Sequence, residues 1–266
     1  MSPRRRALFL TLALLVAAVS IFIVVRVLTS ATSRGATGNV DPTRMGTVVL
    51  VPGYGGSQAA LDTLAARLRT AGRTTAILTL PGNGDGDFAN QADALDATVR
   101  ALLATGAPSV DLIGYSAGGV VVRLWIARYD TARAARRVVT LGSPLHGARI
   151  AAVGAAFDPG ECPVACQQLA PGSALLTQLQ QSGQARPPWL SLWTTDDQTV
   201  QPPDSARLAG AVNVPLQSVC PGADIQHSQL PTAPLVVGLV LRTLAGRGVS
   251  APAPGGCASL EALGGG

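Results

Sequence analysis

The first feature that points to chemistry is the segment Gly114-Tyr115-Ser116-Ala117-Gly118, which has the form G-x-S-x-G. A serine in this setting is a candidate nucleophile for attack on a carbonyl carbon. Small flanking residues are needed because larger side chains would collide across a tight turn. In a chain with 30 glycines this motif can occur by chance, so the motif alone is weak evidence for a nucleophile. The secondary structure expected around it is the stronger evidence.

Those elements are a strand and a helix. The apolar run Val110–Tyr115 leads into Ser116, and a helical pattern follows over residues 117–129. This strand–turn–helix arrangement is the one that exposes a nucleophilic serine at the end of a strand. The start of the helix also directs free N–H groups at a developing oxyanion. The context therefore favours a nucleophile over a serine that merely caps a helix.

Short apolar runs alternate with helical stretches along most of the chain. This rhythm predicts an α/β fold with a mostly parallel sheet of about six strands flanked by helices. The expected domain covers residues 46–246, and residues 143–188 interrupt it as a loop or small cap insertion. Residues 247–266, rich in Gly, Ala and Pro, are expected to form a tail. The other expected strands are 47–52, 74–80, 137–142, 189–194 and 211–217, and the other helices are 57–70, 90–105 and 235–244.

Several motifs in this order resemble the secreted bacterial lipases and esterases of the α/β-hydrolase superfamily. The resemblance spans about residues 45–245 and implies an α/β-hydrolase fold with a Ser-Asp-His triad. Pro52 and Tyr115 stand where the family usually has histidine, and neither position belongs to the triad. The motifs are VVLVPGYGG, DLIGYSAGGVVVRLWI, VVTLGSPLHGA, ACQQLAPGSALLTQL, LWTTDDQTVQPPDSA and HSQLP.

The chain has two histidines that could act as the base, His146 and His227. The superfamily order is Ser, then acid, then His, and His227 satisfies it. Placing the base at His146 would leave only the distant Asp130 between it and Ser116. We therefore predict that His227 is the base and that His146 packs in the fold or lies at the rim of the site.

The acid is expected after a strand between Ser116 and His227, where Asp196 and Asp197 are adjacent. Related enzymes carry it in an Asp-x-x-Val pattern, which Asp197 matches through Val200. We predict that Asp197 orients the imidazole and stabilises its cation, with Asp196 as the alternative.

Two backbone donors are expected to bind the oxyanion. One is the N–H of Ala117, the residue after the nucleophile, and the other comes from the loop after the first strand, at Tyr54. Glycines around Tyr54 allow the backbone to approach a substrate closely. The loop GYGGS does not read as a phosphate-binding loop, because the chain contains no lysine.

The N-terminus has the pattern of a membrane-targeting segment. Arg4, Arg5 and Arg6 precede an uncharged run over residues 7–25, about 28 Å long as a helix and close to the hydrocarbon thickness of a bilayer. We predict that residues 1–30 are a signal anchor, with a cleaved signal peptide as the alternative, and that residues 31–45 are a linker. Either way the domain lies outside the cytoplasm.

Four cysteines agree with an exported protein. Three pairings are possible. Cys162 and Cys166 lie close enough to close a small ring, and Cys220 and Cys257 would then attach the C-terminal segment to the body. Their spacing fits no common zinc site, and we expect neither a metal nor another cofactor.

The net charge of +5 belongs to the N-terminus. Residues 1–40 hold five arginines and no acid, which leaves 15 arginines against 15 acids in the rest of the chain. This balance argues against nucleic acid as a partner.

These observations predict an extracytoplasmic serine hydrolase, a monomer, that cleaves carboxylic esters, lipid or acyl esters above all. An acyltransferase that uses the same triad with an alcohol or glycan as acceptor is the alternative. A non-catalytic protein on a hydrolase fold is disfavoured, because all three triad residues are present.

Overall fold

The structure is a computed structural model, and it describes residues 40–130, 133–158, 160–183, 185–246 and 248–266. The chain divides into two units, Met1–Asn39 and Val40–Gly266. The expected signal anchor and residues 31–39 of the linker lie outside the described residues. Within the described ranges, none of the helices combines the length and the apolar character needed to cross a membrane.

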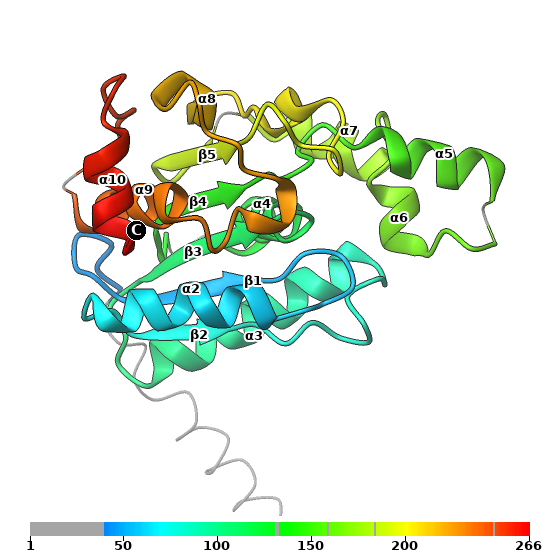
Figure 1. The fold of residues 1–266 in the computed structure, drawn as a ribbon. Helices are drawn as coiled ribbons and strands as arrows, with labels where there is room; N and C mark the ends of the chain where they lie inside the picture. The colour runs from blue at the N-terminus through cyan, green and yellow to red at the C-terminus, as the bar shows by residue number, and fades with distance from the viewer. Residues whose placement is uncertain (1–39, 131–132, 159, 184, 247) are drawn as a thin grey trace, which may run out of the picture. The chain divides into compact units, whose positions relative to one another are not determined.

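Six parallel strands form one sheet, which confirms the predicted α/β-hydrolase architecture (Figure 1). Their order is β2-β1-β3-β4-β5-β6, so β1 and β3 lie side by side although β2 comes between them in the chain. The chain thus reverses direction across the sheet at β1, and the loops after β1 and β3 meet at the carboxyl edge. The strands are β1 Thr47–Val51, β2 Thr75–Ile77, β3 Val110–Tyr115, β4 Ala135–Leu141, β5 Trp189–Trp193 and β6 Val212–Pro215.

Helices cover both faces of this sheet, so alternate strand residues enter two separate cores. Val49 and Leu112 pack in the core under α3 and α4, whereas Val48 and Ile113 pack in the core under α2 and α9. Burial on both faces explains why the strands read as continuous apolar runs in the sequence. The helices are α2 Ala59–Thr70, α3 Phe88–Ala104, α4 Gly118–Tyr129 and α9 Pro234–Ala245.

The predicted insertion, residues 143–188, carries three helices between β4 and β5: α5 Arg149–Phe157, α6 Val164–Gln168 and α7 Ala174–Gln181. We call α5 and α6 the cap. The predicted Cys162–Cys166 disulfide is present in it. A Cβ at Gly154 would lie 3.2 Å from Cys166 Sγ, so this glycine lets α5 approach the disulfide. Figure 1 shows both helices beside the end of the sheet to which the strand arrows point.

The expected C-terminal tail contains a helix, α10 Cys257–Gly264, which packs on α9. A Cβ built at Gly238 of α9 would lie 1.9 Å from the carbonyl oxygen of Leu260. The predicted Cys220–Cys257 disulfide fixes the start of α10 to the body. Small residues here permit close helix packing, so the segment that was expected to be a tail contains a packed helix.

The close approach of α9 and α10 gives a test. Replacing Gly238→Ala should lower the free energy of unfolding by about 1–3 kcal/mol, because the added methyl group must push α10 away. The measurement is the Tm of the full chain. Gly248→Ala is the control, since a Cβ there meets no atom within 4 Å. An unchanged Tm for Gly238→Ala would contradict the packing.

Candidate active site

Ser116 lies in a strained turn between β3 and α4. Its φ of 51° is in the left-handed region, which a serine rarely adopts. A Cβ at Gly114 would lie 2.5 Å from Gly119 Cα, and one at Gly118 would lie 2.3 Å from the carbonyl oxygen of Val51. The glycines of the motif are therefore required by the packing of this turn.

The imidazole of His227 lies between Ser116 and Asp197. Its Nε2 is 3.0 Å from Ser116 Oγ, and its Nδ1 is 2.6 Å from Asp197 Oδ2. His227 begins the short helix η3 His227–Gln229, on the segment between β6 and α9. The structure thus brings together the three side chains that the sequence indicates as a triad, although more than 100 residues separate Ser116 from His227.

Asp197 is fully buried, and backbone amides hold its other oxygen. Its Oδ1 accepts hydrogen bonds from the N–H groups of Thr199 at 2.8 Å and Val200 at 2.7 Å. These donors satisfy Oδ1 and leave Oδ2 free for the imidazole. They also give the Asp-x-x-Val pattern a physical reason, because the fourth residue of the turn supplies a donor.

The neighbouring Asp196 faces elsewhere. Its Oδ2 accepts a hydrogen bond from Gln217 Nε2 at 3.1 Å, and among the described residues it makes no hydrogen bond with His227. The geometry therefore favours Asp197 as the acid.

Tyr115 contacts His227 through both its ring and its hydroxyl group. Its ring centroid is 5.3 Å from that of His227, and its hydroxyl donates to the His227 carbonyl oxygen at 3.3 Å. Burial, with a smaller contribution from the charge of Asp197, raises the pKa of Tyr115 to about 12. The phenol therefore remains a neutral donor at physiological pH. The sequence marked this position only as a departure from the family pattern, and no signal in the sequence revealed the contact.

The two expected oxyanion donors lie on loops next to the serine. A Cβ at Gly53 would lie 3.0 Å from Ser116 Cβ, so the backbone before Tyr54 passes directly beside Ser116. Ala117 follows Ser116 in the turn. Within the residues that the structure describes, the amides of Tyr54 and Ala117 donate no hydrogen bond. Both are thus available to a developing oxyanion.

His146 lies apart from this arrangement. It is exposed, and its Nδ1 lies 3.0 Å from the carbonyl oxygen of Ser205. It makes no hydrogen bond to Ser116 in the described part of the chain, in accord with a histidine at the rim. In the same ranges, no group of three or more His, Cys, Asp or Glu side chains could hold a metal ion.

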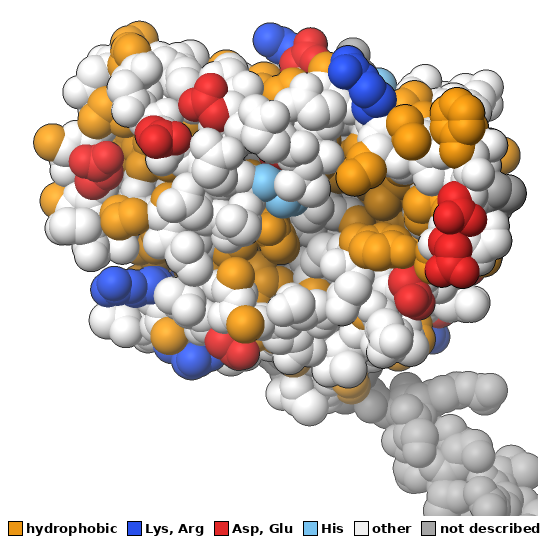
Figure 2. All heavy atoms as spheres, turned by 45° about the vertical axis from the view of Figure 1, so that its right-hand side comes forward, with side chains coloured by type: hydrophobic (Ala, Val, Ile, Leu, Met, Phe, Trp, Pro, Cys, Tyr) orange, Lys and Arg blue, Asp and Glu red, His pale blue; other side chains and the backbone are white. Residues whose placement is uncertain are grey.

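Apolar side chains gather near the carboxyl edge of the sheet. Figure 2 shows a histidine side chain at the border of a hollow in which hydrophobic side chains are visible. Large hydrophobic residues on the cap are exposed: Ile150, Val153, Phe157 and Val164. On α5 their spacing of three and four residues places them along one face of the helix.

Comparison with known proteins agrees with this fold. Residues 48–253 match the model of the alpha/beta hydrolase family. The match covers most of the chain, so the protein belongs to this family, which supports a hydrolase. No curated protein matches the sequence.

Several solved structures share the fold. Aspergillus fumigatus lipase B has a TM-score of 0.71 at 20% identity, and the match covers 85% of this chain but only 58% of that one. Bacillus licheniformis lipase BlEst2 in its mature form has a TM-score of 0.62 at 19% identity, covering 77% of this chain and 93% of that one. At these identities the likeness shows the fold.

The geometry distinguishes the two adjacent acids experimentally. Asp197→Asn should slow covalent labelling by a fluorophosphonate about 10³-fold or more, because an amide no longer holds the imidazole in the tautomer that accepts the serine proton. Asp196→Asn is the matched control and should label at nearly the rate of the unaltered protein. The rate is read from the mass of the intact protein over time. Slow labelling of Asp196→Asn with normal labelling of Asp197→Asn would reverse the assignment.

Proposed function

We propose that this protein is a serine hydrolase that cleaves carboxylic esters through an acyl-enzyme, with Ser116, His227 and Asp197 as its triad. The observation that carries the proposal is the unbroken line of hydrogen bonds from Asp197 through His227 to Ser116, which ends at a strained turn. Membership of the alpha/beta hydrolase family supports it.

The reaction proceeds in two halves. Ser116 Oγ bonds to the ester carbonyl carbon while His227 Nε2 takes the hydroxyl proton, and the N–H groups of Tyr54 and Ala117 bind the oxyanion. The C–O bond to the alcohol then breaks, and the alcohol leaves with the proton from His227. Water attacks the acyl-enzyme in the same way and releases the acid. Asp197 stabilises the imidazolium in both halves.

The cap supports an acyl or lipid ester as the substrate. The amide of Arg149 at the start of α5 donates to the carbonyl oxygen of Gln201 at 2.8 Å, and the Gln201 side chain donates to the carbonyl oxygen of Asp197. The exposed apolar face of α5 is thus attached to the loop that carries the triad acid. An acyl chain leaving the site can lie against it and remove apolar surface from water.

An extracytoplasmic location is part of the proposal. It is supported by the arginines before the apolar N-terminal run and by the two disulfides, which persist in oxidising compartments.

A series of p-nitrophenyl esters from acetate to palmitate tests the proposed function. The full chain in detergent should hydrolyse them, and Ser116→Ala should lose at least about 10³-fold in kcat. Native protein that hydrolyses none of these esters, or Ser116→Ala with normal activity, would contradict the proposal. An added alcohol that diverts most of the acyl group to a new ester would instead identify an acyltransferase.

The same series tests the role of the cap. Ile150→Ser combined with Phe157→Ser should lower kcat/KM about five- to tenfold for long acyl chains, because apolar contact is lost. The rate for acetate should be unchanged. Leu263→Ser is the control, since Leu263 is exposed on α10. An equal loss for acetate and palmitate would show that the cap does not select the chain.

A further inference from the structure

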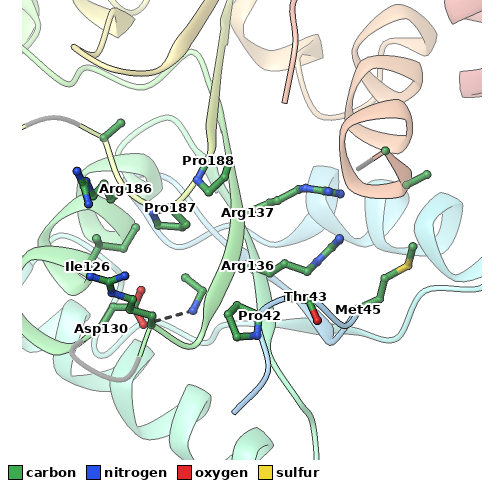
Figure 3. A pocket seen from close by; sticks show the side chains of 15 residues that line it. Pro42, Thr43, Met45, Ile126, Asp130, Arg136, Arg137, Arg186, Pro187 and Pro188 are labelled. Atoms are coloured by element: carbon green, nitrogen blue, oxygen red, sulfur yellow. Dashed lines mark hydrogen bonds between the residues drawn. The ribbon is translucent and has the colours of Figure 1, made fainter. Parts of the chain in front are cut away.

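A second cavity lies at the amino end of the sheet, opposite the edge that carries the triad. It has a volume of about 1120 Å³ and lies where β4 begins and where α4 and α9 end. We call it the β4 pocket. Figure 3 shows arginine side chains from different segments around it. Its lining is Pro42, Thr43, Met45, Ile126, Asp130, Arg133, Ala135, Arg136, Arg137, Ala185, Arg186, Pro187, Pro188, Ala245 and Gly246.

Arg136 and Arg137 are nearly buried in its wall. Arg136 donates from Nε at 2.9 Å and from Nη2 at 2.5 Å to the two oxygens of Asp111, and Nη2 also reaches the carbonyl oxygen of Leu244. Arg137 donates from Nη1 to the carbonyl oxygens of Thr243 and Leu244 at 2.9 and 2.8 Å. Among the described residues, its Nε and Nη2 make no hydrogen bond. Arg136 therefore uses its donors in bonds that hold the fold together, whereas Arg137 retains N–H donors for a ligand.

Positive charge exceeds negative charge at this wall. Arg73, which lines a neighbouring cavity and not the β4 pocket itself, shares Asp111 with Arg136 through a contact of 2.6 Å, so two guanidinium groups bind this single carboxylate. In the described part of the chain, Arg73 Nη1 is buried without a hydrogen-bond partner. The end of α9 contributes about half a negative charge. Together, Arg73, Arg136 and Arg137 retain more than one uncompensated charge, and the exposed Arg133 and Arg186 add to it at the rim.

The acid in the lining, Asp130, is mostly ionised near pH 7 and balances one of the two rim arginines, so the excess at Arg73, Arg136 and Arg137 remains. Asp130 Oδ1 accepts hydrogen bonds from the amides of Ala134 and Ala135, and burial raises the pKa of its carboxyl to about 6. Burial and the charge of Arg136 lower the pKa of Arg137, the effect expected where cations crowd. None of the residues outside the described ranges is Asp or Glu. Their side chains therefore cannot supply the missing negative charge.

We propose that the β4 pocket binds a phosphate group. Buried cations require a counter-charge, and a phosphate monoester, at about −1.5 to −2, matches an excess above one better than a single carboxylate does. Guanidinium groups form paired, charge-assisted hydrogen bonds with phosphate oxygens. Ile126, Met45 and Pro187 give the pocket an apolar side that can contact an organic substituent.

The phosphate can come from a soluble phosphate ester or from a phospholipid headgroup. Pro42 and Thr43, in the first segment that the structure describes, line the pocket. The site does not depend on the proposed ester hydrolysis.

Calorimetric titration of the full chain in detergent at low ionic strength tests the proposal. The ligands are inorganic phosphate, glycerol 3-phosphate and a short-chain diether phosphatidic acid, which has no carboxylic ester to hydrolyse. Sodium acetate and sodium chloride control for charge alone. Saturable binding of one phosphate per chain is expected, and Arg137→Gln and Arg186→Gln should each weaken it about tenfold.

Arg128→Gln is the matched control, because Arg128 is exposed on α4 and does not line the pocket. Its affinity should match that of the unaltered protein. Arg186 is exposed and makes no hydrogen bond in the described part of the chain, so Arg186→Gln tests the site even if Arg137→Gln fails to fold.

The three phosphate ligands identify the source. Phosphatidic acid that binds at least tenfold more tightly than glycerol 3-phosphate supports a headgroup, and equal affinities support a soluble phosphate ester. The absence of saturable phosphate binding, binding of acetate as tight as that of phosphate, or an equal loss in Arg128→Gln would overturn the proposal.

Discussion

The hydrogen bond between Asp197 and His227 is the interaction on which the site depends. Asp197 is removed from water, and a buried carboxylate is stable only when donors surround it. Two backbone amides and the imidazole Nδ1 are those donors. When the neutral imidazole donates its Nδ1–H to Asp197, Nε2 carries no proton and faces Ser116. The tautomer required of a general base therefore follows from the satisfaction of a buried charge.

The sheet makes this arrangement possible. In parallel strands all carboxyl ends lie at one edge, so the turn after β1, the turn after β3 and the loop after β5 meet there. The strain at Ser116 is held in place because β3 and α4 are anchored in the cores on both faces of the sheet. The opposite edge collects the starts of the strands, and there the fold buries arginines around Asp111. One sheet thus separates two chemically different ends.

Much of the fold and site could be predicted from the sequence. Alternating apolar strands, turns and helices are visible in short segments, and the order of serine, acid and histidine can be read along the chain. Ser116 follows from the G-x-S-x-G context, whereas the spacing of the cysteines left three pairings open and the structure shows which one is formed. The hold of Tyr115 on His227 could not be predicted, since it joins residues 112 positions apart. The cluster of arginines at the start of β4 could not be predicted either, because the chain beyond residue 40 has equal numbers of arginines and acids. The helix in the Gly- and Ala-rich C-terminal segment was not predicted, because composition does not distinguish a tail from a closely packed helix.

Nitrogen-15 NMR of the imidazoles tests the central claim most directly. The chain has two histidines, so comparison with His146→Gln assigns the signals of His227. Near neutral pH, the account predicts that His227 carries its proton on Nδ1, that this proton is shifted strongly downfield and exchanges slowly, and that Asp197→Asn removes the shift. A proton on Nε2, or a His227 signal that does not respond to Asp197→Asn, would contradict the account.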